Sequence, residues 1–224
     1  METQGVLRVC TAYLPPLDYC AALVRAGSFQ VETAETYPKQ TIRNRSRIVT
    51  SQGVLTLSVP CIKPQGNHTL VSEVLIDAKQ AWARVHWRGI CTAYNNSPYF
   101  LYYKDEWADL YQWAEKEARS GLRLLDFNDR ILDLLVQKLR LPVRRLNVLE
   151  LRSKAGVPEN GTAKGGFVPP LDFDAAQAPC FAFEPYMQTF PCDADVARLS
   201  ILDLLFNVGP QSLAYLQSAR FQAR

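Results

Sequence analysis

Near its start, the chain shows two patterns of apolar residues, one typical of strands and one typical of a helix. Residues 6–12 (VLRVCTA) are short and rich in β-formers, which predicts a strand. Apolar residues then recur at helical spacing across 17–26, which predicts a helix that Gly27 ends. Residues 28–32 (SFQVE) predict a second strand. A strand, a helix and a second strand form a βαβ unit, so we expect the two strands to be parallel.

Alternating apolar residues continue after this unit. Residues 47–50 and 54–59 flank the turn 51–53 and predict a β-hairpin, because Leu55, Leu57 and Val59 alternate with polar residues. Apolar residues with the spacing of strands predict further strands at 69–76 and 146–151. Apolar residues at helical spacing predict helices at 80–94, 105–119 and 126–140.

The last third of the chain changes in composition. Eight of the 28 residues at 153–180 are Gly or Pro, which predicts a long loop. Two helices follow, and the first begins at Ser200, which fits a helix cap before Asp203. Residues 207–210 end that helix and open the second.

These elements predict an α/β fold with a Rossmann-like βαβ start, a mixed sheet flanked by helices and a helical C-terminal part. We expect residues 1–150 to form an α/β core domain that includes the hairpin and its helices. A Gly/Pro-rich loop is expected at 151–180. Residues 181–224 are expected to form a helical segment that packs on the same domain.

Composition narrows the class of protein. The chain has 224 residues, of which 48% are hydrophobic and 21% charged, as is usual for a globular protein with a sizeable core. The net charge of +3 is too small to favour nucleic acid as a partner. With two histidines and no Cys-x-x-Cys pair, we expect neither a metal ion nor a cofactor. No secretory signal and no apolar run of about 18 residues is present, so we expect a cytoplasmic location without a membrane span.

The densest positive charge lies between Tyr37 and Arg47. Four of these eleven residues are cationic and none is acidic: Lys39, Arg43, Arg45 and Arg47. In an extended segment, the alternate spacing of the three arginines would place their guanidinium groups on one face. Such a group is suited to bind phosphate, carboxylate or a nucleic-acid backbone. A solvated surface strand is the alternative.

This basic stretch follows the predicted βαβ unit. Open α/β sheets bind ligands at the carboxyl ends of their strands, beside helix N-termini. The turn Tyr13–Pro16 has that position after the first predicted strand. We therefore expect this turn and the stretch Tyr37–Arg47 to face one crevice.

Several phrases of the sequence resemble one family. They are Tyr-Leu-Pro-Pro-Leu-Asp-Tyr at 13–19, Tyr-Pro-Lys-Gln-Thr-Ile-Arg-Asn-Arg at 37–45, Leu-Ser-Val-Pro at 57–60, Trp82 with His86, Ala-Tyr-Asn-Asn-Ser-Pro-Tyr-Phe at 93–100, and Leu-Ser-Ile-Leu-Asp-Leu-Leu-Phe-Asn at 199–207 with Gly209-Pro210. In matching order and over most of the chain, they are similar to the WbqC-like family of bacterial proteins.

The resemblance implies a role in surface-glycan biosynthesis, because members occur in O-antigen gene clusters. It favours an enzyme, namely a transferase that moves an aminoacyl group (glycine) or an acyl group onto a nucleotide-linked amino sugar. The basic stretch would then bind phosphate of a phosphorylated or nucleotide-sugar ligand. A non-catalytic module that binds anions or nucleic acid is the alternative, and a homodimer is left open. A nucleotidyl-transfer enzyme is not favoured, because residues 13–19 lack its histidine pair.

Candidate site residues follow from residue type and from this resemblance. His86 is the best available general base, since its ordinary pKa is about 6.5. Asp203 is the second catalytic candidate, with a first-turn helix acid as the alternative. The substrate-binding candidates come from the Tyr13–Pro16 turn, from the basic stretch, and from two aromatic residues, Tyr94 and Tyr99, whose rings could stack on a sugar or base. They are Tyr13, Tyr37, Lys39, Gln40, Arg43, Asn44, Arg45, Arg47, Tyr94 and Tyr99.

Overall fold

The βαβ unit forms as the hydrophobic pattern predicts. In the computed structural model, which describes residues 6–146 and 180–222, β1 spans Leu7–Cys10, α1 spans Leu17–Ala26 and β2 spans Ser28–Glu32. β1 and β2 pair in parallel, and β7 (Arg144–Arg145) extends this sheet beside β2. Gly27 ends α1 in the left-handed conformation, with φ of 67°, which glycine adopts without strain.

The other strands form antiparallel pairs. They are β3 (Arg45–Thr50) with β4 (Gly53–Ser58), β5 (Cys61–Ile62) with β6 (Leu75–Ile76), and β8 (Cys180–Ala182) with β9 (Arg220–Gln222). Within the described ranges, these three pairs are separate from the parallel sheet. The α/β class and the hairpin are confirmed, and the hairpin strands begin slightly earlier than predicted.

One strand prediction differs from the structure, and a second falls almost wholly outside the described residues. The predicted strand 69–76 contains only β6 at its end, because a short 3₁₀ helix occupies Val71–Glu73. In that helix a Glu73 carboxylate oxygen accepts a hydrogen bond from the Leu70 backbone N–H, which closes a turn. The predicted strand 146–151 lies outside the described residues beyond Leu146, as does most of the predicted loop 151–180.

The predicted helices are present. They are α2 (Trp82–Tyr94), α3 (Phe100–Ala118), α4 (Leu124–Lys138), α6 (Ile201–Val208) and α7 (Ser212–Ser218). α3 begins five residues before its predicted start, because aromatic residues after Tyr99 join the helix. The helical C-terminal part is confirmed, although the chain returns to a strand at β9 after α7.

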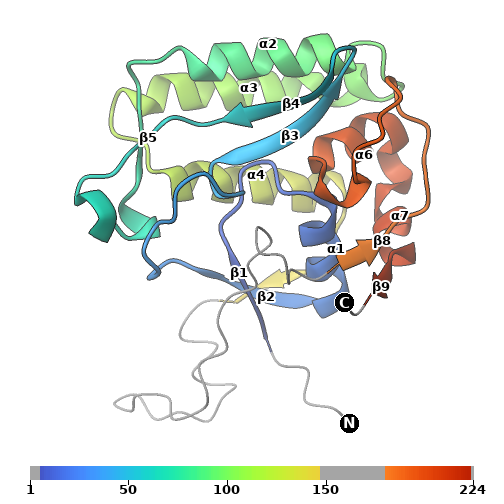
Figure 1. Cartoon of the computed structure of the whole chain (residues 1–224), viewed down its shortest axis with the longest axis horizontal. Coiled ribbons are helices and arrows are strands. Elements are labelled where there is room, and N and C mark those ends of the chain that lie inside the picture. Colours follow the sequence, from blue (N-terminus) through green and yellow to red (C-terminus); the bar gives the residue numbers. More distant parts are fainter. Residues whose placement is uncertain (1–5, 147–179, 223–224) are drawn as a thin grey trace.

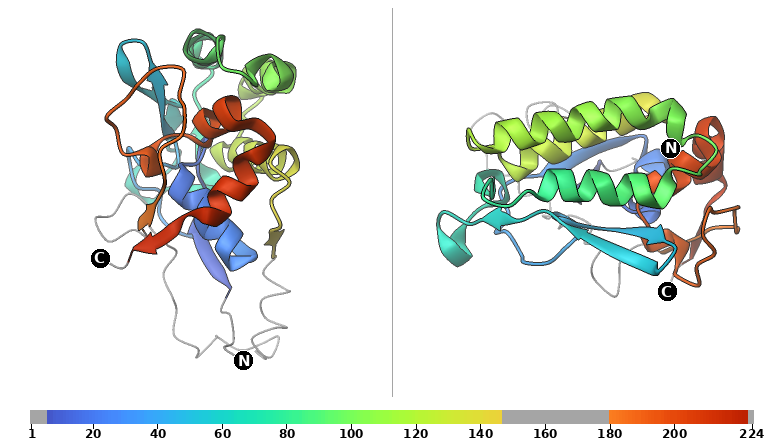
Figure 2. Two further views of the ribbon diagram at one scale, coloured as in Figure 1. Left: turned by 90° about the vertical axis from the view of Figure 1, so that its right-hand side faces the viewer. Right: turned by 90° about the horizontal axis from the view of Figure 1, so that it is seen from above.

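The elements stack in layers. α2 and α3 run side by side along one edge of the molecule, and the β3–β4 hairpin lies against α2 (Figure 1). Figure 2 shows α2 between the hairpin and α3 when the molecule is seen from above. The parallel sheet lies on the opposite edge, and α1 contacts both α6 and α7. Within the described ranges, no helix combines the length and apolar character needed to cross a bilayer.

Large aromatic side chains fill the core between these layers. Among the most deeply buried are Trp107, Tyr13, Tyr19, Tyr94, Phe29, Phe127 and Phe206. Full burial of a side chain such as phenylalanine contributes about 1.5–3 kcal/mol to stability. Two residues predicted to bind substrate, Tyr13 and Tyr94, therefore belong to the packed core.

Candidate functional site

The turn after β1 contacts the basic stretch directly. The Tyr13 backbone N–H donates to the Ile42 carbonyl at 2.9 Å, and the Ser46 hydroxyl donates to the Leu14 carbonyl at 2.7 Å. Leu14 is fully buried and has φ of 43°, a conformation that costs a bulky residue about 1–3 kcal/mol. The turn and the basic stretch therefore lie together at the carboxyl end of β1. The backbone of the turn is strained at Leu14.

Arg43 has a different environment from the other cations of the stretch. It lies in the turn before β3, and its side chain is buried against Glu35. Its Nε and Nη2 both donate to Glu35 Oε1, at 2.8 and 2.6 Å, and its Nη1 donates to Thr41 Oγ1 at 3.3 Å. The prediction that three guanidinium groups share one strand face is therefore wrong for Arg43. The sequence reasoning missed Glu35 because it lies just outside the basic stretch.

Arg45 and Arg47 lie on one face of β3. Between them, Ser46 points inward to Leu14, while Arg47 is exposed and Arg45 is partly buried. Their cross-strand neighbours on β4 are Ser58 and Thr56, which carry no charge. This geometry matches the predicted face for these two arginines.

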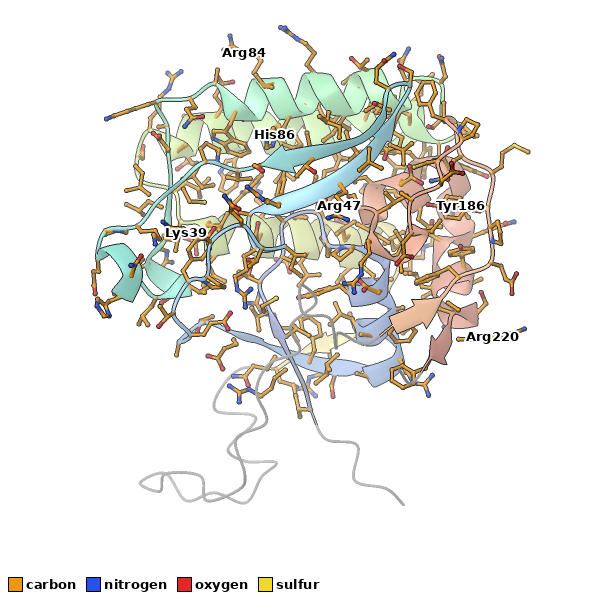
Figure 3. All side chains as sticks on the ribbon, in the orientation of Figure 1. Lys39, Arg47, Arg84, His86, Tyr186 and Arg220 are labelled. Atoms are coloured by element: carbon orange, nitrogen blue, oxygen red, sulfur yellow. The ribbon has the colours of Figure 1, made fainter. Side chains whose placement is uncertain are left out.

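Lys39 lies on the loop that precedes β3, and Arg47 lies further along, beside α6 (Figure 3). Lys39 and its neighbour Gln40 are exposed, and Gln40 has φ of 62°. In the part of the chain that the structure describes, no ion pair involves Lys39, Arg45 or Arg47. We call these three side chains the basic face, and their charges are not neutralised by described acidic residues.

A polar cluster lies beside Arg45. The buried Tyr37 hydroxyl donates to Cys61 Sγ at 3.8 Å, and this thiol donates to the Val59 carbonyl at 3.4 Å. The same carbonyl accepts from Asn44 Nδ2 at 3.0 Å. Two side chains, Cys61 and Asn44, therefore meet at one carbonyl, and Tyr37 joins them through the Cys61 thiol. Sequence reasoning missed Cys61, whose only signal is its position just after the Leu-Ser-Val-Pro phrase.

The electrostatics of this cluster keep its groups protonated. Burial raises the pKa of Tyr37 well above its ordinary value, while the nearby charges of Arg43 and Arg45 act to lower it. Burial also raises the pKa of Cys61 to about 11. A thiol with this pKa is almost entirely protonated at neutral pH, so Cys61 is not poised as a nucleophile. The cluster is suited to hydrogen bonding rather than to covalent chemistry.

His86 is packed beneath the hairpin among aromatic rings. It is 5% exposed, its Nδ1 lies 2.8 Å from the Tyr13 hydroxyl, and the Trp82 ring meets it edge-on. The Tyr13 hydroxyl also lies 2.6 Å from that of Tyr111. Burial lowers the pKa of His86 to about 4, against a smaller opposing effect of a hydrogen bond with the Ser58 backbone. His86 is therefore neutral at pH 7, and Figure 3 shows it between α2 and the hairpin, apart from Lys39 and Arg47.

Asp203 joins three parts of the chain through its buried carboxylate. Tyr94 on α2 donates to Oδ1 at 2.9 Å, and Gln188 Nε2 donates to Oδ2 at 2.6 Å. Tyr186 also donates to Oδ2. Burial raises the pKa of Asp203, whereas these three hydrogen bonds act to lower it. Sequence reasoning missed Tyr186 and Gln188, because nothing local marks them as partners of a residue on α6.

Tyr99 packs on the C-terminal helical part of the chain. Its backbone N–H donates to the Phe206 carbonyl at 3.0 Å. A Cβ atom added at Gly209 would lie 2.5 Å from the Tyr99 ring, so only glycine fits beside it. The structure thus divides the predicted site residues among the basic stretch, the pair Tyr13–His86, the pair Tyr94–Asp203 and Tyr99.

Metal binding has no candidate in the described ranges, where no three His, Cys, Asp or Glu side chains are grouped as ligands.

Comparisons with known proteins place these residues in context. The sequence model of the WbqC-like protein family matches residues 11–160, which include the Tyr13–Pro16 turn, the basic stretch and the hairpin. The chain is also 28% identical over 226 residues to a Mycobacterium tuberculosis protein described as uncharacterized protein Rv1507c, with 93% of this chain and 95% of that protein covered. No solved structure matches the chain at a significant level.

Proposed function

Because the chain belongs to the WbqC-like protein family, we propose that it is a cytoplasmic transferase of surface-glycan biosynthesis that binds a phosphorylated or nucleotide-linked sugar. The proposed binding surface is the basic face, Lys39, Arg45 and Arg47. The observation that carries the proposal is the guanidinium of Arg45. It is partly buried, it forms no ion pair with the described residues, and its Nε lacks a hydrogen-bond partner among them.

An arginine at this position is suited to bind a phosphate group. A guanidinium group presents parallel N–H donors that match two oxygens of a phosphate, and partial burial strengthens each charge-assisted hydrogen bond. Residues two apart on a strand lie about 6–7 Å from each other, so the long side chains of Arg45 and Arg47 can reach one diphosphate. Arg43 serves a different purpose, because Glu35 already neutralises its charge.

The proposed reaction is transfer of an acyl or aminoacyl group to the sugar. The amino nitrogen of the sugar would attack the acyl carbon and form the new C–N bond. The bond from that carbon to its carrier would break, with the electron pair going to the carrier atom, which would take up the proton that the amine loses. We propose positioning roles for His86 and Asp203 in this reaction, because both side chains are buried and hydrogen-bonded. His86 would support the hairpin that presents Arg45, and Asp203 would hold α2, α6 and the segment around Tyr186 together.

Ligand titration tests this proposal. We expect the protein to bind at least one UDP-, dTDP- or GDP-linked sugar saturably, as measured by calorimetry at constant ionic strength. Arg45→Ala should lower the affinity about 10- to 100-fold, since a hydrogen bond to a charged group contributes about 1.5–3 kcal/mol. Arg84→Ala is the matched control. It removes the same charge from the outer side of α2, where Arg84 pairs with Glu115 (Figure 3). Equal affinities for the two folded variants would refute the proposed site.

A non-catalytic module that binds anions or nucleic acid is the second candidate. It is favoured by the burial of His86 and Asp203, which leaves the predicted acid–base pair without access to a ligand on the basic face. Such a module would bind arbitrary oligonucleotides, and its affinity would fall steeply as salt rises. The non-catalytic module would be excluded if one sugar nucleotide binds saturably and oligonucleotides do not displace it.

A further inference from the structure

We infer that Asn128, a buried side chain on α4, positions Arg45 for its ligand by fixing the peptide group between Arg43 and Asn44. This inference rests on the proposed function. It assigns to the basic face a positioning residue that does not itself contact the ligand and that lies 85 residues after Arg43 in the chain.

The turn at 41–44 directly precedes β3 and leads into Arg45. All four of its backbone carbonyls accept hydrogen bonds. Three of them accept from backbone N–H groups, and the Thr41 carbonyl, for example, accepts from the N–H of Arg45 at 3.0 Å. The fourth, that of Arg43, accepts from a side chain, because Asn128 Nδ2 donates to it at 2.8 Å. The turn therefore depends on Asn128 for one of its four carbonyl bonds.

Asn128 is itself held by two other parts of the fold. Its Nδ2 donates a second hydrogen bond to Thr11 Oγ1 at 3.1 Å, and Thr11 directly follows β1. The start of α4 is anchored where the Leu124 backbone N–H donates to the Val74 carbonyl at 2.9 Å. Asn128 is 2% exposed, so its packed neighbours restrict the side chain to one orientation. A donor that is held in this way fixes the carbonyl that it faces.

The contact requires the amide of asparagine in one orientation. A carbonyl oxygen only accepts hydrogen bonds, so the NH₂ group, and not Oδ1, faces the Arg43 carbonyl. That carbonyl and the Asn44 nitrogen belong to one planar peptide group, so they rotate together. Without the Asn128 donor, the buried carbonyl would have no partner there, and rotation of the peptide group towards water would be favoured.

Such a rotation would affect Arg45 more than Arg43. The Arg43 guanidinium is anchored by its hydrogen bonds to Glu35 and Thr41. Arg45 forms no ion pair with the described residues, so the direction of its side chain follows its backbone. A charge-assisted hydrogen bond to phosphate depends on distance and angle. Asn128 therefore controls how well Arg45 can bind the anion.

A double-mutant cycle tests the inference. The probe is inorganic diphosphate, the part that UDP-, dTDP- and GDP-linked sugars share, and calorimetry well below the unfolding temperature measures its affinity. Asn128→Ala should weaken binding about 3- to 10-fold, part of the loss expected for Arg45→Ala. In the Arg45→Ala background, the same change should weaken binding no further, because the side chain that it positions is absent.

Asn207→Ala is the matched control. Asn207 on α6 also uses its Nδ2 to donate to a backbone carbonyl, that of Asp203 at 2.8 Å, but that carbonyl lies outside the turn at 41–44. The variant removes the same kind of hydrogen bond and should leave the affinity for diphosphate unchanged. A loss of affinity equal to that of Asn128→Ala would overturn the inference.

Hydrogen exchange in the wild-type protein tests the same inference without any Asn128 variant. If the Asn128 hydrogen bond raises the affinity for the anion, the bound anion strengthens that hydrogen bond by the same factor, because coupling is reciprocal. We therefore expect saturating diphosphate to slow exchange of the Asn128 side-chain NH₂ protons about 3- to 10-fold more than exchange of those of Asn207.

The outcomes separate this inference from the proposed function. The inference is overturned if folded Asn128→Ala binds diphosphate like the wild-type protein, or if its loss adds in full to that of Arg45→Ala. It is also overturned if diphosphate slows the exchange of the two asparagines equally, whether or not the Asn128 variant folds. In each case the proposed phosphate site stands as long as Arg45→Ala weakens binding. If Arg45→Ala has no effect, the proposed site itself is wrong.

Discussion

Replacement of Asp203 by alanine is expected to lower the free energy of unfolding by about 2–4 kcal/mol, because it breaks a buried hydrogen-bond network. The variant leaves the donors of Tyr94, Tyr186 and Gln188 without their common acceptor. Each buried donor left unpaired costs about 1–3 kcal/mol. Asp203→Asn should lower the free energy of unfolding by less, because the amide oxygen of asparagine can still accept a hydrogen bond. Equilibrium unfolding in urea measures both values.

Asp193→Ala is the matched control for this experiment, because Asp193 is exposed on the segment that leads to α6. It should change the unfolding free energy by less than about 0.5 kcal/mol. If Asp203→Ala unfolds at the same urea concentration as the wild-type protein yet abolishes turnover, the carboxylate would have a chemical role, and the positioning role proposed for it would be wrong.

The second large effect is a loss of stability in mild acid that depends on His86. Its folded-state pKa of about 4 lies below the ordinary value of 6.5, so between these two pH values the unfolded chain binds the proton that the folded protein excludes. The stabilising contribution is complete above about pH 6.5 and is lost as the pH falls towards 4. Over this window the loss is about 3 kcal/mol, since one pKa unit corresponds to about 1.4 kcal/mol.

Unfolding in urea between pH 7.5 and 4.5 measures this effect. His86→Gln should flatten the pH dependence, because glutamine does not titrate and can still hydrogen-bond to Tyr13. His68→Gln should follow the wild-type curve, because His68 is exposed at the end of the short 3₁₀ helix Gly66–His68. If wild type and His86→Gln show the same slope, His86 is not the buried neutral base that the structure indicates.

Local patterns predicted those elements whose limits are set by local chemistry. α1 has the predicted bounds because its apolar spacing and the left-handed Gly27 act within ten residues. The predicted strand at 69–76 fails at its start because the Glu73 carboxylate closes a turn on Leu70, and an apolar repeat does not reveal that hydrogen bond. β9 was missed because it forms only by pairing with β8, some forty residues earlier in the chain.

For the candidate site, residue type located the cations but not their environments. Arg43 and Arg45 are equivalent in the sequence, yet one is paired with Glu35 and the other has no described acidic partner. His86 was predicted as a base because of its ordinary pKa, whereas burial among aromatic rings keeps it neutral. Burial and pairing depend on the tertiary fold, so no local pattern could separate a binding arginine from a structural one.

The central claim is that the Arg45 guanidinium receives the anion of the ligand. The most direct measurement is the ¹⁵N–¹H resonance of Arg45 Nε during titration with a UDP-linked sugar, assigned by its disappearance in Arg45→Lys. We predict a large shift and slower solvent exchange for Arg45 at saturation, because its Nε–H gains a buried acceptor, while the Arg84 resonance stays in place. An unchanged Arg45 resonance in the presence of bound ligand would contradict the account.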